Sequence, residues 1–199
     1  YNKLALIKDF IKDSKIIYGK APKLEELEKE YDMIVDCTGF NRVYLPKMEQ
    51  DFFLPTYEYK VTDAFLKKHG GKVLQTKGRP IRLATPNKCK PFYKGKVVGV
   101  GESIGTVYAL LGEGIIPSMQ CVDIFIKNMN DFAAYEKAVD EHYKIYGKVF
   151  NFVHAKIQKN FSFLKALPDF MAIFRYMKKN EDRFGMDIRI ADLLKVAKA

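Results

Sequence analysis

Residues 97–115 constrain the fold of this chain more than any other segment. Val97-Val98-Gly99-Val100 is a short continuous apolar run, typical of a strand buried within a parallel sheet. Apolar residues then recur at helical spacing from Ile115 to Met129, which predicts a helix. Four glycines between the two elements permit close approach of the backbone: Gly101, Gly105, Gly112 and Gly114. A strand, a glycine-lined turn and a helix in this order indicate an α/β layer.

The glycine-lined turn also predicts ligand binding. A helix N-terminus offers free N–H groups and a positive dipole end to an anionic or electron-rich ligand. Glu102, just past the apolar run, can accept hydrogen bonds from ligand hydroxyl groups.

A second candidate site follows the β-rich run at 31–39. It ends in Asp36-Cys37-Thr38-Gly39, so a carboxylate, a thiol, a hydroxyl and a glycine stand together at its C-terminal end. Ligands of α/β sheets bind beyond the carboxyl ends of strands, so chemistry is expected here. A strand that simply turns at these residues explains the motif equally well.

The opening of the chain predicts alternating helix and strand. Apolar residues at helical spacing predict an amphipathic helix from Leu4 to Ile11. Ile16-Ile17-Tyr18 predicts a short strand, and a short acidic segment spans Leu24 to Glu30.

The middle and the end of the chain differ in character. Prolines between short extended pieces at 57–62, 72–75 and 81–84 predict a small antiparallel β insertion. His69 lies within this insertion and has no neighbouring residue at the spacing of a metal site, so we expect it to lie in a turn.

After Asp131 the pattern is helical almost to the end, with a helix start at Pro168-Asp169 and a last amphipathic helix at 188–196.

Composition excludes several classes of protein. Apolar residues make up 48% and charged residues 29% of the 199 residues, as in folded globular chains. Three dispersed cysteines favour neither a disulfide framework nor a zinc site, so we expect a reducing cytoplasm and no metal. The net charge of +10 comes mostly from lysines spread along the chain and favours a solvated basic surface, with an anionic membrane surface as the alternative. No nucleic-acid recognition motif accompanies the charge.

Taken in order, these motifs resemble those of the geranylgeranyl reductase family of FAD-dependent oxidoreductases, relatives of the p-hydroxybenzoate hydroxylase fold. Members carry a strand ending in D-A-T-G, which corresponds here to Asp36-Cys37-Thr38-Gly39. Their later G-D-A-A-G corresponds to Gly101-Glu102-Ser103-Ile104-Gly105, and their closing G-E-G-I to Gly112-Glu113-Gly114-Ile115.

The resemblance implies roles in binding FAD. Glu102, one methylene longer than the family's aspartate, would bind a ribityl hydroxyl, and the backbone from Gly101 to Gly105 would approach the pyrophosphate. Gly112, Glu113, Gly114 and Ile115 would face the flavin ring. Thr38 and Gly39 would pack near the adenosine-side phosphates. No residue is assigned a catalytic role.

The resemblance also implies a domain organisation. Residues 1–46 and 90–130 would be the later part of a Rossmann-type FAD-binding α/β domain. Residues 47–89 would form a small β-rich insertion on the substrate side, and 131–199 a C-terminal helical region. The G-x-G-x-x-G turn that opens such flavoproteins is absent from this chain. We expect that unit upstream of Tyr1; a remnant that binds no flavin is the alternative.

The function that the resemblance implies is reduction of carbon–carbon double bonds of an isoprenoid lipid by hydride transfer from reduced FAD. The protein would be cytoplasmic, with peripheral contact to an anionic membrane as an option. Two alternatives stay open, a flavin-dependent monooxygenase on the same fold and a non-catalytic lipid-binding or scaffolding protein. The sequence indicates neither the electron donor nor the oligomeric state.

Overall fold

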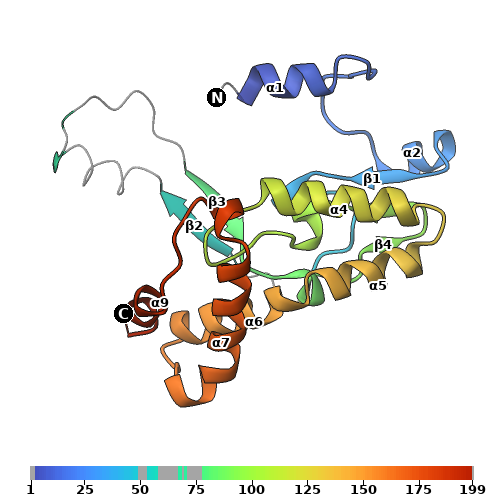
Figure 1. Cartoon of the computed structure of the whole chain (residues 1–199). Helices are drawn as coiled ribbons and strands as arrows, with labels where there is room; N and C mark the ends of the chain where they lie inside the picture. The colour runs from blue at the N-terminus through green and yellow to red at the C-terminus, as the bar shows by residue number, and fades with distance from the viewer. Residues whose placement is uncertain (1–2, 49–52, 58–66, 69, 71–77, 199) are drawn as a thin grey trace. The chain divides into compact units, whose positions relative to one another are not determined.

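The described residues of this mixed α/β chain form two small sheets and a larger set of helices (Figure 1). The computed structural model describes residues 3–48, 53–57, 67–68, 70 and 78–198. The chain divides into two compact units, Tyr1–Asp32 and Met33–Ala199.

The first unit contains two short helices, α1 (Lys3–Phe10) and α2 (Leu24–Glu30). The predicted opening helix is therefore confirmed. The strand predicted at Ile16-Ile17-Tyr18 is wrong, because these residues form no regular structure and Tyr18 is 89% exposed. A strand requires a hydrogen-bonded neighbour, and none of the described residues pairs with this segment.

A three-stranded sheet forms the centre of the second unit. Its order is β1 (Ile34–Asp36), β5 (Val97–Gly99) and β4 (Tyr93–Lys94), with β5 parallel to β1 and antiparallel to β4. The strand predicted from the valine run is confirmed, and all three residues of β5 are buried. The run at 31–39 supplies only three strand residues, since β1 pairs with β5 from Ile34 to Asp36 alone.

A separate antiparallel pair lies within the predicted insertion. It consists of β2 (Phe53–Tyr57) and β3 (Gly78–Arg82), with Leu54 opposite Ile81. This pairing confirms antiparallel β structure there. Residues 58–62 of the extended piece predicted at 57–62, the piece predicted at 72–75, and His69 lie outside the described residues.

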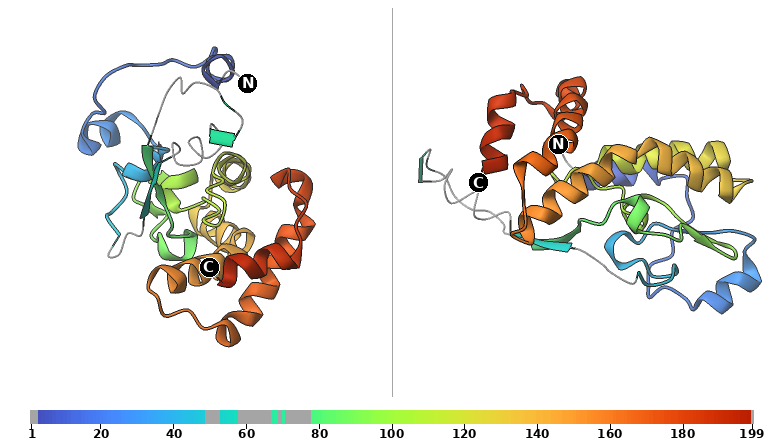
Figure 2. Two further views of the ribbon diagram at one scale, coloured as in Figure 1. Left: turned by 90° about the vertical axis from the view of Figure 1, so that its left-hand side faces the viewer. Right: turned by 90° about the horizontal axis from the view of Figure 1, so that it is seen from below.

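The C-terminal part of the second unit is helical, with α4 (Ile115–Asn128), α5 (Phe132–His142), α6 (Lys144–Ile157), α7 (Phe163–Lys179), α8 (Glu181–Phe184) and α9 (Ile190–Lys198). They confirm the predicted helix after Gly114 and the helical end of the chain. α4 packs beside α5, and α6 beside α7, in all views (Figure 2). Asp131 caps α5 by accepting a hydrogen bond from the Ala134 N–H at 3.0 Å.

The helix start predicted at Pro168 is wrong. α7 begins five residues earlier, at Phe163, and Pro168 lies inside it. Proline removes the hydrogen bond to the carbonyl oxygen of Leu164, but Leu164 is 82% exposed and that oxygen can bond to water. Burial of Phe170, Ile173 and Met177 along the inner face of α7 favours the continuous helix.

Candidate functional site

The carboxyl ends of β1 and β5 bring the two predicted motifs to one edge of the sheet. The strands are parallel, with Asp36 opposite Gly99, so the chain leaves both at the same end. β1 continues into the turn η1 (Gly39–Asn41), and β5 continues into the turn η3 (Gly101–Ile104). These two turns are called here the strand-end site.

Asp36 holds the loop that follows β1. It is 1% exposed, and its Oδ1 accepts the Thr38 N–H at 3.0 Å and the Thr38 hydroxyl at 2.6 Å. Its Oδ2 accepts the N–H groups of Tyr44 at 2.8 Å and Leu45 at 3.3 Å. Burial acts to raise the pKa of Asp36, but these hydrogen bonds stabilise the charged form and hold the pKa below its ordinary value. Asp36 is therefore a structural carboxylate.

Thr38 is engaged by the same loop. Its hydroxyl donates to Asp36 and accepts the N–H of Val43 at 2.9 Å. The Thr38 N–H also donates to Asp36, so both hydrogen-bond donors of Thr38 are used within the loop.

Replacing Asp36 with asparagine should cost roughly 2 kcal/mol at about pH 7, because an amide cannot accept all four hydrogen bonds. The pKa of Asp36 is lower in the folded chain than in the unfolded chain, so its stabilisation is complete above about pH 4 and is lost below that. Urea denaturation across this range should show the wild-type advantage shrinking in acid. A difference between the two proteins that stays constant with pH would contradict this role.

Glu102 is the carboxylate that folding leaves available at the strand-end site. It is half-buried beside Gly39, and a Cβ placed on Gly39 would lie 3.2 Å from Glu102 Oε2. Within the described part of the chain, no hydrogen bond or ion pair engages the Glu102 side chain. Gly39 has a φ of 65°, so a larger residue there would be strained and would press on this carboxylate. Glu102 can therefore accept hydrogen bonds from hydroxyl groups of a ligand.

The first turns of α4 lie against η3. A Cβ on Gly101 would lie 3.2 Å from Ser118 Oγ, and Thr106 Oγ1 is 3.3 Å from the same hydroxyl. The Gly101 N–H donates to Cys121 Sγ at 3.4 Å. Gly114 precedes α4 and has no side chain to cap the first N–H groups of the helix. The start of α4 therefore borders the strand-end site.

Gly105 supports the site from the interior. It is buried with a φ of 80°, and a Cβ there would lie 2.4 Å from the Ala84 carbonyl oxygen and 2.6 Å from Cys89 Sγ. Its N–H closes η3 by donating to the Glu102 carbonyl oxygen at 3.0 Å. The close backbone approach at Gly105 is therefore to this chain's own atoms.

The Gly112-Glu113-Gly114 motif forms a tight turn before α4. The Tyr108 N–H donates to the Glu113 carbonyl oxygen at 2.8 Å, and the Gly112 N–H donates to the Tyr108 carbonyl oxygen at 2.9 Å. Gly112 is exposed with a φ of 66°, and Ile115 is 58% exposed. A ligand can reach the turn at these two residues.

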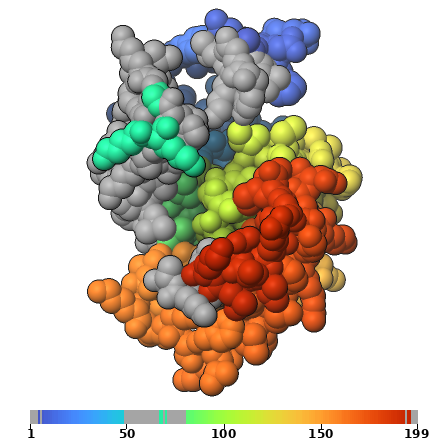
Figure 3. Space-filling view, turned by 60° about the vertical axis from the view of Figure 1, so that its left-hand side comes forward, coloured from blue at the N-terminus to red at the C-terminus, as the bar shows by residue number. Residues whose placement is uncertain are grey.

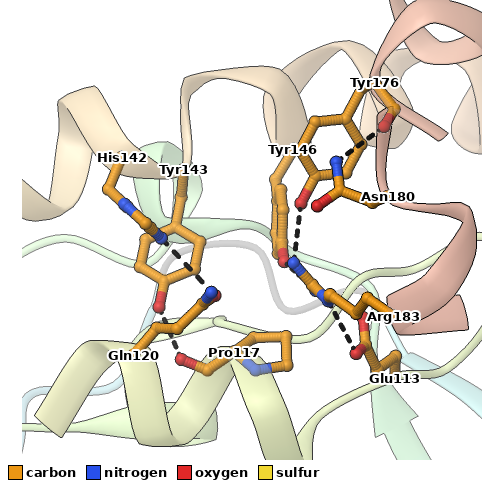
Figure 4. Close-up of polar contacts among 9 residues, drawn as sticks. All are labelled: Glu113, Pro117, Gln120, His142, Tyr143, Tyr146, Tyr176, Asn180 and Arg183. Atoms are coloured by element: carbon orange, nitrogen blue, oxygen red, sulfur yellow. Dashed lines mark hydrogen bonds and ion pairs between the residues drawn. The ribbon is translucent and has the colours of Figure 1, made fainter. Parts of the chain in front are cut away.

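The Glu113 carboxylate is bound by Arg183 of α8. Arg183 Nε donates to Oε1 at 2.9 Å and Nη2 to Oε2 at 2.5 Å, and the two side chains are only 14% and 18% exposed. Arg183 also donates to the hydroxyls of Tyr176 at 3.1 Å and Tyr146 at 3.3 Å (Figure 4). Glu113 therefore connects the turn before α4 to the C-terminal helices.

Tyrosines that follow α4 in the chain fix the position of β5 and α4. The Tyr135 hydroxyl donates to the Gly99 carbonyl oxygen at 2.8 Å. The Tyr143 hydroxyl donates to the Pro117 carbonyl oxygen at 2.5 Å (Figure 4). Burial raises the pKa of Tyr143, so its hydroxyl stays protonated and remains a donor. Tyr135, Tyr143 and Tyr146 are all buried and pack within the fold.

Two arginines of this framework carry no recognisable sequence signal. Arg183 is one, and Arg42, which is 6% exposed, is the other. Arg42 donates to the carbonyl oxygens of Pro46 at 2.9 Å, Pro91 at 2.6 Å and Ser103 at 2.6 Å. It thereby joins the loop after β1 to η3, across 61 positions of sequence. Only the folded chain brings these groups together.

No group of three or more His, Cys, Asp and Glu side chains that could hold a metal ion occurs in the described ranges. Comparison with protein-family models, with curated proteins and with solved structures found no match. A functional assignment therefore depends on the residues of the strand-end site and their neighbours.

Proposed function

We propose that the strand-end site binds FAD and that this protein is an FAD-dependent oxidoreductase. The observation that carries the proposal is the Glu102 carboxylate, which no described residue engages and which lies beside Gly39 where β1 and β5 end. A carboxylate at this edge can accept hydrogen bonds from the hydroxyl groups of a ribityl chain. The other two carboxylates of the motifs, Asp36 and Glu113, are already used by the fold.

The remaining residues of the proposed site divide into two groups. Gly39 and Gly101 would allow the cofactor to approach the backbone, and Gly112, Gly114 and Ile115 would border the ring at the start of α4. Thr38, Gly105 and Glu113 instead hold the framework in which these residues stand. Bound FAD would supply the redox chemistry.

The substrate we favour is a lipid with a long hydrocarbon chain, such as an isoprenoid whose double bonds are reduced. Apolar side chains around the start of α4 are exposed: Leu111 by 41%, Ile115 by 58%, Ile116 by 41% and Met119 by 56%. An apolar surface of this kind beside the proposed ring position supports binding of an apolar chain.

The proposal is tested by flavin content. The full-length product of the gene is purified, its visible absorption is recorded, and any released cofactor is identified. We expect bound FAD, with binding weakened by at least roughly tenfold in Glu102→Ala because a charged hydrogen-bond acceptor is lost. Glu102→Asp, which keeps the carboxylate, should retain most of the affinity.

A matched control and a second position sharpen the test. Glu141 is an exposed carboxylate on α5, and Glu141→Gln should bind FAD as the wild type does. Gly114 has a φ of −124° and a Cβ there would meet only Val107 Cγ2 at 3.4 Å, so Gly114→Val should fold but hold flavin poorly. A folded, colourless protein that ignores added FAD would overturn the proposal in favour of lipid binding without catalysis. If the protein instead used oxygen to form a hydroxylated product, it would be a flavin-dependent monooxygenase.

A further inference from the structure

The turn between α6 and α7 presents apolar side chains outward. This segment, residues 156–167, is called here the basic turn. Leu164 is 82% exposed, more than any other large apolar side chain described in 33–199. Three more large apolar residues of the turn are also exposed: Ile157 by 44%, Phe163 by 38% and Leu167 by 39%. Exposed apolar residues grouped in this way indicate an interaction surface.

An aromatic cluster holds the basic turn in place. Phe152 and Phe170, which are 6% and 2% exposed, supply its buried base. Phe161 packs against Phe152 with ring centroids 5.3 Å apart, and Phe163 against Phe170 at 5.8 Å. These ring contacts hold the turn in place, and Leu164 points outward from it.

Positive charge surrounds these exposed side chains. No Asp or Glu occurs from residue 142 to residue 168, and lysines stand in that interval at 144, 148, 156, 159 and 165. Lys148 pairs with Asp169 at 3.0 Å, and Lys156 lies 4.8 Å from the Phe161 ring centroid. Lys159 and Lys165 are exposed and form no ion pair with any described residue.

We propose that the basic turn docks this protein on an anionic lipid bilayer. Leu164, with Phe163 and Leu167, would enter the boundary between headgroups and acyl chains, and Lys159 and Lys165 would face anionic headgroups. The turn joins the end of α6 to the start of α7, and Figure 3 shows the orange segment that contains it at the surface. None of the described helices is long and apolar enough to cross a bilayer. This proposal is independent of flavin binding.

Charge complementarity favours the bilayer over a second copy of the chain. Two basic turns facing each other would place lysines against lysines, which opposes self-association. An anionic bilayer accepts both the apolar side chains and the surrounding charge.

Co-sedimentation with vesicles tests the docking. The full-length protein is mixed with phosphatidylcholine vesicles and with vesicles that also contain phosphatidylserine. We expect binding to the anionic vesicles only, weakening as salt is added. Leu164→Asp should reduce the affinity roughly tenfold, and Lys159→Glu/Lys165→Glu by more than tenfold. Both changes are at exposed positions, so unfolding midpoints should match the wild type.

Control variants repeat the same chemistry elsewhere on the second unit. Ile126 on α4 is 59% exposed, and Lys127 and Lys137 are exposed lysines. Ile126→Asp and Lys127→Glu/Lys137→Glu should leave vesicle binding within about twofold of the wild type, because these residues lie outside the basic turn. Failure to sediment with anionic vesicles would overturn the proposal. So would equal losses in turn and control variants, or a Leu164→Asp change in oligomeric state with unchanged lipid binding.

Discussion

Gly105→Ala should lower the free energy of unfolding by about 3 kcal/mol, a large loss for the addition of one methyl group. The new Cβ would lie 2.4 Å from the Ala84 carbonyl oxygen and 2.6 Å from Cys89 Sγ, so backbone must move. The φ of 80° adds strain that only glycine avoids. Urea denaturation should show a lower midpoint with an unchanged slope.

Gly185 provides the matched control for this prediction. It has a φ of 61°, but no atom lies within 4 Å of a Cβ built there. Gly185→Ala should therefore cost only the strain of the left-handed conformation, about 1 kcal/mol. Equal losses of unfolding free energy in the Gly105 and Gly185 variants would show that the clash with Ala84 and Cys89 adds nothing to the cost of Gly105→Ala. A clear excess at Gly105 would establish that this glycine serves the fold.

Arg183→Met should cost about 2–4 kcal/mol, because it leaves the largely buried Glu113 carboxylate without its partner. The hydroxyls of Tyr146 and Tyr176 also lose the hydrogen bonds that they accept from the Arg183 guanidinium. Glu113→Gln should cost less, and the Glu113→Gln/Arg183→Met double variant should be more stable than the sum of the two losses predicts, by about 1–3 kcal/mol. Thermal or urea denaturation of the four proteins measures this coupling.

An exposed ion pair supplies the comparison. Lys195 and Asp192 of α9 lie 3.1 Å apart with side chains 80% and 58% exposed. Lys195→Met should change stability by less than about 0.5 kcal/mol. Additive losses in the Glu113 and Arg183 variants would mean that the two side chains act independently, against the bidentate geometry. Strong coupling would show that Glu113 and Arg183 stabilise the fold as a pair.

The elements that carry the site could be predicted because their signals are local. The valine run at 97–99 and the apolar period after Gly114 depend on neighbours a few residues away, and both elements formed where predicted. Prediction failed at Ile16-Ile17-Tyr18, where a strand needs a distant partner, and at Pro168, where packing of α7 outweighs a local helix-start signal. Local pattern states what a segment can form, whereas pairing and burial decide what it does form.

The chemistry of the site also depends partly on local sequence and partly on tertiary structure. Sequence alone determined that carboxylates and glycines follow two strands, because residue type and order are local properties. Tertiary structure decided which carboxylate is available: Asp36 closes a loop, Glu113 binds Arg183 seventy positions away, and Glu102 remains beside Gly39. Whether a charged group can bind a ligand depends on what surrounds it in space, since a neighbour from elsewhere in the chain can satisfy the same hydrogen bonds first.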